Sequence, residues 1–392
     1  MIKVPGFLSS GVWSGVKKRG KKDLALIYSE SPAKAAGVFT KNLVKAPPVV
    51  LGIERIKSGL CQAVLVNSGI SNAFTGKDGL KRARSSSAFV ARSLGIDENL
   101  VIPSSTGVIG GPLPLDKIKK AMPKLVKELR EEGFMDFAQA IMTTDAFPKY
   151  VSTKIRIGNK TGTIAVIGKG AGMMAPNMAT MLCYILTDIS LSKRALSRAL
   201  RSSVDKSLNK IIVDGDTSTN DTALLLSSGE LGNKAVPLSG REYDKFEKAL
   251  TEALTEVAEM IVADGEGATK TVKIIVKGAK TYKDAEKIAR VLGTSALVKT
   301  AFFGEDPNWG RIVAAAGRAG VNFDPDKIGL YFGDHKVLSK SREVMDEKKA
   351  RKILKNPKFE VTLNINSGKA SSFVIASDLT FEYIKINAHY RT

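Results

Sequence analysis

The sequence contains 392 residues, of which 43% are hydrophobic and 25% charged; this allows two or three domain-sized units with buried cores and excludes a disordered chain. Its two cysteines, Cys61 and Cys183, exclude a disulfide framework and fit a cytoplasmic protein. Because no apolar run approaches the roughly 18 residues of a membrane span and the first residues lack the apolar region of a signal peptide, no membrane association is expected.

The formal net charge of +21 raises the question of a nucleic-acid partner. The lysines and arginines are spread along the chain, and basic clusters such as residues 17–22 contain no interleaved aromatic side chains. No helix-turn-helix, zinc-finger or RNA-recognition signature is present. The favoured interpretation is a solvated basic surface without a nucleic-acid partner, which would also attract small carboxylate substrates.

Short apolar runs rich in β-formers predict strands at residues 24–28, 63–67, 151–157, 163–167, 182–187, 211–214, 222–226, 272–276, 328–332 and 359–363. Helical periodicity lies between them, at residues 116–132, 192–208 and 241–263. Pro123 is expected to kink or split the first helix, and Ser192 to cap the second. Strands and helices alternate unevenly, which predicts an α/β fold of mixed α+β layers instead of a regular βαβ winding.

Five polar or glycine-rich segments are expected to be loops on this frame, at residues 67–76, 103–111, 168–180, 214–222 and 302–311. The chemistry they could carry is limited by the two histidines, His335 and His389. Neither lies in a recognisable catalytic-triad motif, and no cysteine or histidine stands at zinc-ligand spacing. No metal is therefore expected, and an acyl-transfer enzyme of this sequence would need a base other than histidine.

Residues 168–180 read GKGAGMMAPNMAT and separate two predicted strands. The glycines Gly168, Gly170 and Gly172 alternate, so neither the dinucleotide-binding pattern nor a phosphate-binding P-loop is met. Taken alone, the segment is best interpreted as a glycine-rich turn whose methionines pack inward.

Thr180, at the end of this segment, suggests a different chemistry. A threonine at a new N-terminus is a complete acyl-transfer unit, because its hydroxyl attacks while its own α-amine takes the proton. Such a terminus requires an N-to-O acyl shift at the bond between Ala179 and Thr180, which small neighbouring residues would permit. This chemistry would replace the missing histidine base.

Two further loops were candidates for a supporting role. Thr106 and Gly107, in the run PSSTG, carry a hydroxyl and an N–H that could stabilise a tetrahedral oxyanion, although a simple β-turn explains the run equally well. Asp214, Asp216 and Asp221 resemble a metal loop but fail the EF-hand pattern, so a hydrogen-bonded turn beside a site is favoured.

Together these segments resemble one family, the ornithine acetyltransferases, also called glutamate N-acetyltransferases. The resemblance covers essentially the whole chain and rests on the blocks NSGISNAFTG, PSSTGVIG, MTTDAFPK, KGAGMMAPNMATML, DGDTSTNDT, DGEGATK, FFGEDPNWGRI and the C-terminal INAHYRT. KGAGMMAPNMATML is the most specific of them. The order of the blocks along the chain makes a chance similarity implausible.

The resemblance implies a four-layer α/β/β/α fold similar to, but distinct from, that of N-terminal nucleophile hydrolases. It implies cleavage between Ala179 and Thr180, giving an α chain of residues 1–179 and a β chain of residues 180–392. The fragments would stay together as a heterotetramer of two α and two β chains. Thr180 would then carry acetyl from N2-acetylornithine to glutamate in arginine biosynthesis, with no cofactor.

The same resemblance assigns roles to individual residues. Thr106 and Gly107 match the oxyanion donors, and the positions matching substrate-binding residues are Thr143, Lys169, Thr180, Glu266, Asn387 and Thr392. A cation such as Lys169 suits a substrate carboxylate, and an anion such as Glu266 suits the amines of ornithine. The C-terminal tail, residues 381–392, is expected to be a docked strand with apolar residues on both faces.

Two other enzyme activities remain open on the sequence. Some family members also make N-acetylglutamate from acetyl-coenzyme A, and no residue here distinguishes the two types. A self-cleaving aminopeptidase or amidase, in which water replaces glutamate, is a different class of enzyme with the same nucleophile. The proposed amino-acid pocket of Lys169, Glu266, Asn387 and Thr392 argues against the latter.

Overall fold

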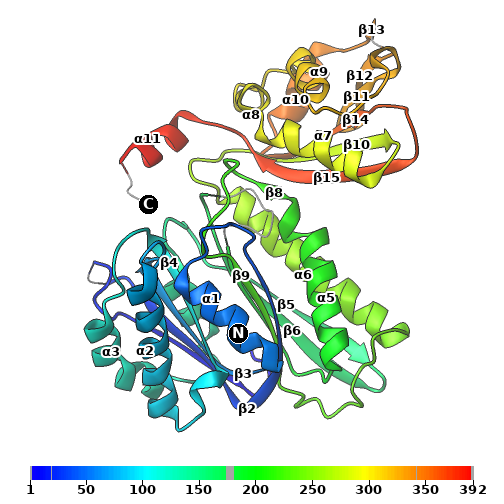
Figure 1. The fold of residues 1–392 in the computed structure, drawn as a ribbon. Helices are drawn as coiled ribbons and strands as arrows, with labels where there is room; N and C mark the ends of the chain where they lie inside the picture. Colours follow the sequence, from blue (N-terminus) through cyan, green and yellow to red (C-terminus); the bar gives the residue numbers. More distant parts are fainter. Residues whose placement is uncertain (1, 19, 174–180, 341, 390–392) are drawn as a thin grey trace.

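Figure 1 shows the computed structural model of the protein, which describes residues 2–18, 20–173, 181–340 and 342–389. Two β-sheets organise these residues. In the first sheet the strand order is β4-β3-β2-β9-β7-β6-β5, with β1 paired to β2. Its members are β1 (Phe7–Val12), β2 (Leu24–Phe39), β3 (Leu60–Ile70), β4 (Val101–Val108), β5 (Lys149–Ile157), β6 (Lys160–Lys169), β7 (Leu182–Thr187) and β9 (Thr222–Ser227).

The long strand β2 folds this sheet back on itself. Its first part, residues 24–28, pairs with β1 and β3, and after a register shift its last part, residues 34–39, pairs with β9. The two halves of the sheet therefore face each other across a shared apolar core, which includes Ile27, Val66, Ile167, Tyr184 and Leu224. Helix α4 (Phe134–Ile141) closes this core, where Phe137 packs edge-on against Tyr184 with 5.3 Å between ring centroids.

Helices cover both outer faces of the folded sheet, as Figure 1 shows. On one side α2 (Gly76–Leu94) and α3 (Leu115–Lys127) bury the apolar residues of β1, β2 and β3, and α1 (Pro47–Arg55) packs beside them on β4. On the other side α5 (Lys193–Lys206) and α6 (Arg241–Ala263) cover β5, β6, β7 and β9. The layers run α/β/β/α, which confirms the predicted four-layer arrangement.

The period of the sequence explains these layers. In β6 the side chains of Ile164 and Val166 point to α6, while Ala165 and Ile167 point to the inner core, as the two-residue repeat of a strand requires. Helix α6 begins and ends where the periodicity predicted, and it buries one face through Phe246, Leu250, Leu254, Val257 and Ile261. Ser192 caps α5 by accepting from the N–H of Ala195 at 3.2 Å, whereas Pro123 lies inside α3.

The second sheet has the order β13-β12-β11-β14-β10-β15-β8. It comprises β8 (Ile211–Ile212), β10 (Thr271–Ala279), β11 (Gly329–Phe332), β12 (His335–Ser339), β13 (Arg342–Glu343), β14 (Lys358–Asn364) and β15 (Ala370–Ser377). The helices α7 (Tyr282–Thr294), α8 (Ala296–Phe303), α9 (Trp309–Gly317) and α10 (Glu347–Leu354) surround its core. Short 3-10 turns occur at Ile56–Ser58, Glu98–Leu100, Leu208–Lys210 and Pro325–Lys327.

Strand β8 connects the two sheets. It pairs with β15 at the edge of the second sheet, whereas β9, the next strand along the chain, lies inside the first sheet between β2 and β7. The intervening residues 213–221 must therefore pass from one sheet to the other. Among the described residues no helix combines the length and the apolar character that crossing a bilayer would require.

Three predicted loops are more regular than expected. The run that contains Thr106 and Gly107 is not a turn but the end of β4, whose edge position accommodates Pro103. Residues 67–70 belong to β3. The segment 302–311 includes the end of α8 and the start of α9, which Asn308 caps by accepting from the N–H of Arg311 at 3.1 Å.

The predicted C-terminal strand is wrong. Residues Phe381–His389 form helix α11, which follows Thr380, and the Thr380 hydroxyl accepts from the N–H of Tyr383 at 3.2 Å. A cap of this kind satisfies an amide that a helix start leaves unpaired. The apolar residues expected on two buried faces of that strand are instead largely exposed, Phe381 to 79% and Ile384 to 60%.

Candidate active site

A cavity of about 180 Å³ lies where the first sheet, the segment between the sheets and α11 meet. Its walls come from the strand ends that carry Thr106, Gly107 and Lys169, from the loops beside them and from α11. Six residues selected from the sequence line it, namely Thr106, Gly107, Thr143, Lys169, Glu266 and Asn387.

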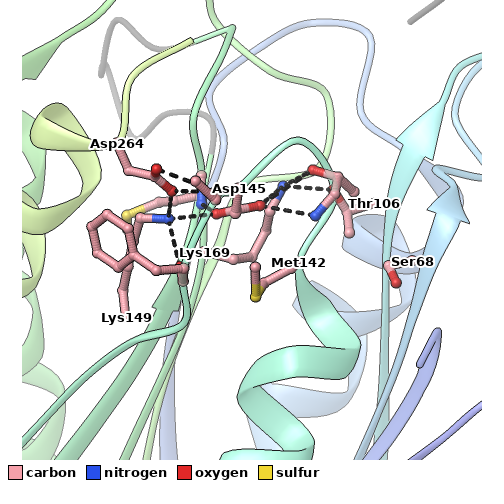
Figure 2. A network of polar contacts seen from close by, with 12 residues as sticks. Ser68, Thr106, Met142, Asp145, Lys149, Lys169 and Asp264 are labelled. Carbon is pink, nitrogen blue, oxygen red and sulfur yellow. Dashed lines mark hydrogen bonds and ion pairs between the residues drawn. The ribbon is translucent and has the colours of Figure 1, made fainter. Parts of the chain in front are cut away.

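Lys169, the last residue of β6, is the cation of this cavity and is 7% exposed. Its ammonium donates to the hydroxyl oxygen of Thr143 at 2.8 Å and to that of Thr106 at 3.1 Å (Figure 2). Because the Thr106 hydroxyl accepts from lysine, its own hydrogen is available for a ligand. The Thr143 hydroxyl also accepts from lysine, but it donates to the carboxylate of Asp145 at 3.5 Å. Burial lowers the pKa of Lys169, and the negative charge of Asp145 opposes that effect.

Asp145 lies beneath Lys169, with 3.9 Å between the carboxylate and the ammonium. It accepts from the N–H of Gly170 at 2.7 Å, from the N–H of Thr143 at 2.9 Å and from the Lys149 ammonium at 2.8 Å. Burial by itself would raise the pKa of Asp145. The charges of Lys169 and Lys149, together with these hydrogen bonds, nevertheless hold that pKa below its ordinary value, so the carboxylate is ionised at neutral pH.

Gly107 stands beside Thr106 in a conformation that favours glycine, with φ of 125°. A Cβ at this position would lie 2.3 Å from the carbonyl carbon of Gly69 in β3. Any side chain here would push β3 and β4 apart, so the sequence ends β4 with a backbone that lies unusually close to its neighbour.

Glu266 supplies negative charge to the same cavity. It follows α6, is 9% exposed and accepts from the side-chain amide of Asn387 in α11 at 2.9 Å. Gly172 leaves room for it, because a Cβ there would lie 2.5 Å from a carboxylate oxygen of Glu266. Burial, with the charges of Asp214 and Glu266, raises the pKa of the nearby Tyr383 phenol. The cavity thus offers both a cation and carboxylates, as a zwitterionic ligand requires.

Residues 213–221, which connect the sheets, contribute a wall of the cavity and bond to Met173 and Met181, the described residues that flank positions 174–180. The Asp214 carboxylate accepts from the N–H of Met173 at 2.6 Å, and that of Asp221 accepts from the N–H of Met181 at 2.8 Å. Asn220 donates to the carbonyls of Ser71 at 2.7 Å and Ser105 at 2.9 Å. These bonds tie the segment to the strands and loops around the cavity. Within the described residues no three His, Cys, Asp or Glu side chains converge on a possible metal position.

Comparison with known proteins shows which family this chain resembles. The model of the ArgJ family matches residues 8–392. The arginine biosynthesis bifunctional protein ArgJ of Geobacter sulfurreducens is 45% identical over 393 residues, which cover 100% of both chains. The protein of the same name from Caldanaerobacter subterraneus is 46% identical over 397 residues, covering 100% of this chain and 98% of its own.

This chain belongs to the ArgJ family. It is accordingly an enzyme of the acyltransferase class, as the sequence predicted. A solved structure of ornithine acetyltransferase from Mycobacterium tuberculosis, in complex with ornithine, is 36% identical and has a TM-score of 0.40; the match covers 44% of this chain and 93% of that one.

The six named above share one cavity, and their individual roles stay predictions. Ala179, Thr180 and Thr392 lie outside the described residues. Met173 lines the main cavity, however, and Met181 lines a small adjoining one with Thr106, Lys169 and Asp221, so the described residues on both sides of 174–180 border the site.

The sequence did not single out Asp145, Lys149 or Asp264, although all three bear on the site. The motif MTTDAFPK contains the first two, but acidic and basic residues at such spacing are common on exposed surfaces. Their burial, which gives them significance, depends on α6 lying against β5 and β6. It could not be read from the local sequence.

Proposed function

We propose that this chain is a glutamate N-acetyltransferase of arginine biosynthesis, which moves acetyl from N2-acetylornithine to glutamate through an acetyl ester on Thr180. The observation that carries the proposal is the convergence of Thr106, Thr143 and Lys169 with Glu266 and Asn387 in one cavity. Met173 lines this cavity, and Met181 lines the small one that adjoins it. Hydroxyl donors, a cation and a carboxylate are what acyl transfer between two amino acids needs.

The first step is self-cleavage. The Thr180 hydroxyl attacks the carbonyl carbon of Ala179, the C–N bond breaks, and the resulting ester is hydrolysed by water. This leaves a carboxylate on Ala179 and a free α-amine on Thr180, which serves as the base afterwards. The hydroxyl of Thr106 and the N–H of Gly107 stabilise the oxyanion.

Acetyl transfer repeats the same chemistry on the substrates. The Thr180 hydroxyl loses its proton to its own α-amine and attacks the acetyl carbonyl of N2-acetylornithine. The C–N bond of the acetyl group then breaks, and the N2 nitrogen of ornithine takes up that proton as ornithine leaves. The amine of glutamate then attacks the acetyl ester and gives up a proton through the α-amine of Thr180. The C–O bond of the ester breaks, the Thr180 oxygen takes the proton to restore the hydroxyl, and N-acetylglutamate leaves. Lys169 binds a substrate carboxylate and Glu266 the side-chain amine of ornithine, which orient the reacting atoms.

The test is an assay of purified enzyme with acetylornithine and glutamate, followed by mass spectrometry of both products. We expect ornithine and N-acetylglutamate to form in equal amounts without coenzyme A, and an acetyl group to be trapped on Thr180 when glutamate is omitted. The variant Thr180→Ala should be uncleaved and inactive. Release of free acetate at the same rate with and without glutamate would instead indicate an amidase.

A second activity is favoured by one observation, since the relatives from Geobacter sulfurreducens and Caldanaerobacter subterraneus are named bifunctional. We propose that the chain also acetylates glutamate with acetyl-coenzyme A as co-substrate. The same assay with acetyl-coenzyme A in place of acetylornithine tests this. No N-acetylglutamate under those conditions would restrict the enzyme to the transfer reaction.

A further inference from the structure

A buried chain of charges lies beside the site and includes none of the residues that the family resemblance selected except Lys169. The Lys149 ammonium bridges the carboxylates of Asp145, at 2.8 Å, and Asp264, at 2.5 Å (Figure 2). The Lys149 side chain is completely buried, and that of Asp264 is 6% exposed. With Lys169 the group holds two cations and two anions, so its formal charges balance.

Such a group is costly to build. Moving a charged group out of water has a large desolvation cost. Apolar residues of the same volume would often stabilise the fold as well or better. The hydrogen bonds of these carboxylates are therefore informative, because they show what the charges hold in place.

Asp145 holds the cationic part of the cavity. One carboxylate oxygen accepts from the N–H of Gly170, directly after Lys169, and the other from the N–H of Thr143. A single carboxylate thus holds the backbone at Thr143 and directly after Lys169. The same carboxylate lies 3.9 Å from the Lys169 ammonium.

Asp264 holds the segment that carries the anion. It directly follows α6, accepts from the N–H of Ala146 at 3.0 Å, and precedes Glu266 by two positions. The N–H of Glu266 in turn donates to the carbonyl of Ala171 at 2.9 Å. Lys149 therefore connects the segment of Thr143 and Asp145 with the segment that places Glu266.

We propose that Asp145, Lys149 and Asp264 form a positioning network that holds Lys169 and Glu266 at a fixed separation for the amino-acid substrate, with Asp145 as the carboxylate that faces the Lys169 ammonium. The inference rests on the proposed function for the identity of that substrate. None of the three touches the reacting atoms; they act through Lys169, Thr143 and Glu266.

The variant Asp145→Asn tests the charge. The charged groups acting on Lys169 are Asp145, Lys149, Glu266, Asp221 and Lys17. Replacing the nearest carboxylate with a neutral group of the same shape leaves the positive neighbours, so the pKa of Lys169 should fall further. The high-pH limb of kcat/KM should then move to lower pH by about one unit or more, and KM for both substrates should rise roughly 10- to 100-fold.

The variant Asp264→Asn tests the link to Glu266. It keeps the ion pair of Asp145 and Lys149, so the high-pH limb should stay closer to that of the wild type. KM for acetylornithine should rise more than KM for glutamate, because the freed segment carries the residue assigned to the ornithine amine. This variant also keeps the inference testable if Asp145→Asn does not fold.

Asp188→Asn is the matched control. Asp188 is also buried and accepts from a backbone N–H, that of Thr163 at 2.7 Å, but at the opposite end of β6. We expect it to change stability without moving the pH limb or the ratio of the two KM values. If Asp145→Asn behaves in the same way, the network is only structural and the inference is wrong.

Titration calorimetry with ornithine and glutamate, repeated across pH, separates this inference from the proposed function. A wild type that binds ornithine but transfers no acetyl would refute the function, whereas the predicted weakening of binding in Asp145→Asn would still support the network. Unchanged affinity and pH dependence in both variants would overturn the network even if the wild type is fully active.

Discussion

At the scale of single residues, the site concentrates buried polar groups whose protonation depends on their neighbours. Lys169 and Asp145 stabilise each other's charge, while within the described residues no ion pair joins Asp221 to a cation. Burial raises the pKa of Asp221 well above its ordinary value, since desolvation outweighs the N–H of Met181 and the more distant charge of Lys169. The pKa values of two carboxyls near one cavity are thus shifted in opposite directions, that of Asp145 downwards and that of Asp221 upwards.

The variant Thr106→Val tests the oxyanion assignment. It removes the hydroxyl but keeps the shape, so kcat should fall roughly 10²- to 10³-fold with KM little changed, and self-cleavage should slow as well. Steady-state kinetics on cleaved enzyme give the first result, and a time course on gels gives the second. Thr153→Val, in β5 away from the cavity lining, is the control; an unaltered kcat in Thr106→Val would remove Thr106 from the mechanism.

The variant Asp221→Asn should change how stability depends on pH. A carboxyl whose folded pKa is raised binds its proton more tightly in the folded state, so stability falls as pH rises from its unfolded value near 3.8 towards the folded one. Asparagine does not titrate, and the variant should lose less stability over that window. Denaturant unfolding at about pH 4.5 and about pH 7.5 measures this. Equal losses in both proteins would contradict the assignment of a raised pKa.

At the scale of elements, the C-terminal segment shows how a site can depend on a helix that has little core of its own. No described residue of α11 is buried. Phe381 packs edge-on against Phe303 with 5.6 Å between ring centroids, and the side-chain amide of Asn387 donates to Glu266. Such a helix is stabilised by its cap and by the site it borders more than by apolar burial.

Deleting residues 389–392 tests whether the tail takes part in binding. We expect an intact, self-cleaved protein whose KM for acetylornithine and glutamate rises about 10-fold or more, because polar contacts to the substrate are lost while Thr180 is retained. Steady-state kinetics with each substrate measure the effect. His389→Ala alone should behave as the wild type, since that side chain is exposed; wild-type KM values in the deletion variant would remove Thr392 from the site.

At the scale of the whole molecule, the predicted cleavage point does not separate two folding units. Strand β6 ends at Lys169 and β7 begins at Leu182, and these two strands pair with each other in the first sheet. Strand β9, from the second fragment, pairs with β2 from the first. Cleavage would therefore leave both fragments in one hydrogen-bonded sheet with one shared core, so they should remain associated.

Purified protein should accordingly show two bands in a denaturing gel, of about 19 and 23 kDa when 42.0 kDa is divided by length. N-terminal sequencing of the larger band should begin Thr-Met-Leu-Cys. Without denaturant the fragments should elute together in gel filtration, and light scattering tests the proposed heterotetramer. A single uncleaved band with full activity would rule out the mechanism, and Thr180→Ala supplies the reference for that band.

Local sequence was sufficient for elements with a clear period. The strand at 182–187 and the helix at 241–263 begin and end where predicted, because apolar residues repeat every two or every three to four positions along them. It was insufficient for β4, where glycine and serine suggested a loop, and for the C-terminal tail, where a few apolar residues fit both a strand and a helix. In both cases neighbouring segments decided the conformation.

The sequence by itself determined the family, because its motifs, in their order along the chain, combine residue types that few other structures need together. Only the tertiary structure decided that Lys169 donates to both Thr106 and Thr143. It also decided that the ion pairs of Lys149 with Asp145 and Asp264 lie beside these three residues. The physical reason is that a buried charge gains its properties from partners far along the chain, as Lys149 does from Asp264, 115 positions away. Folding brings those partners together, and no local pattern records their distance.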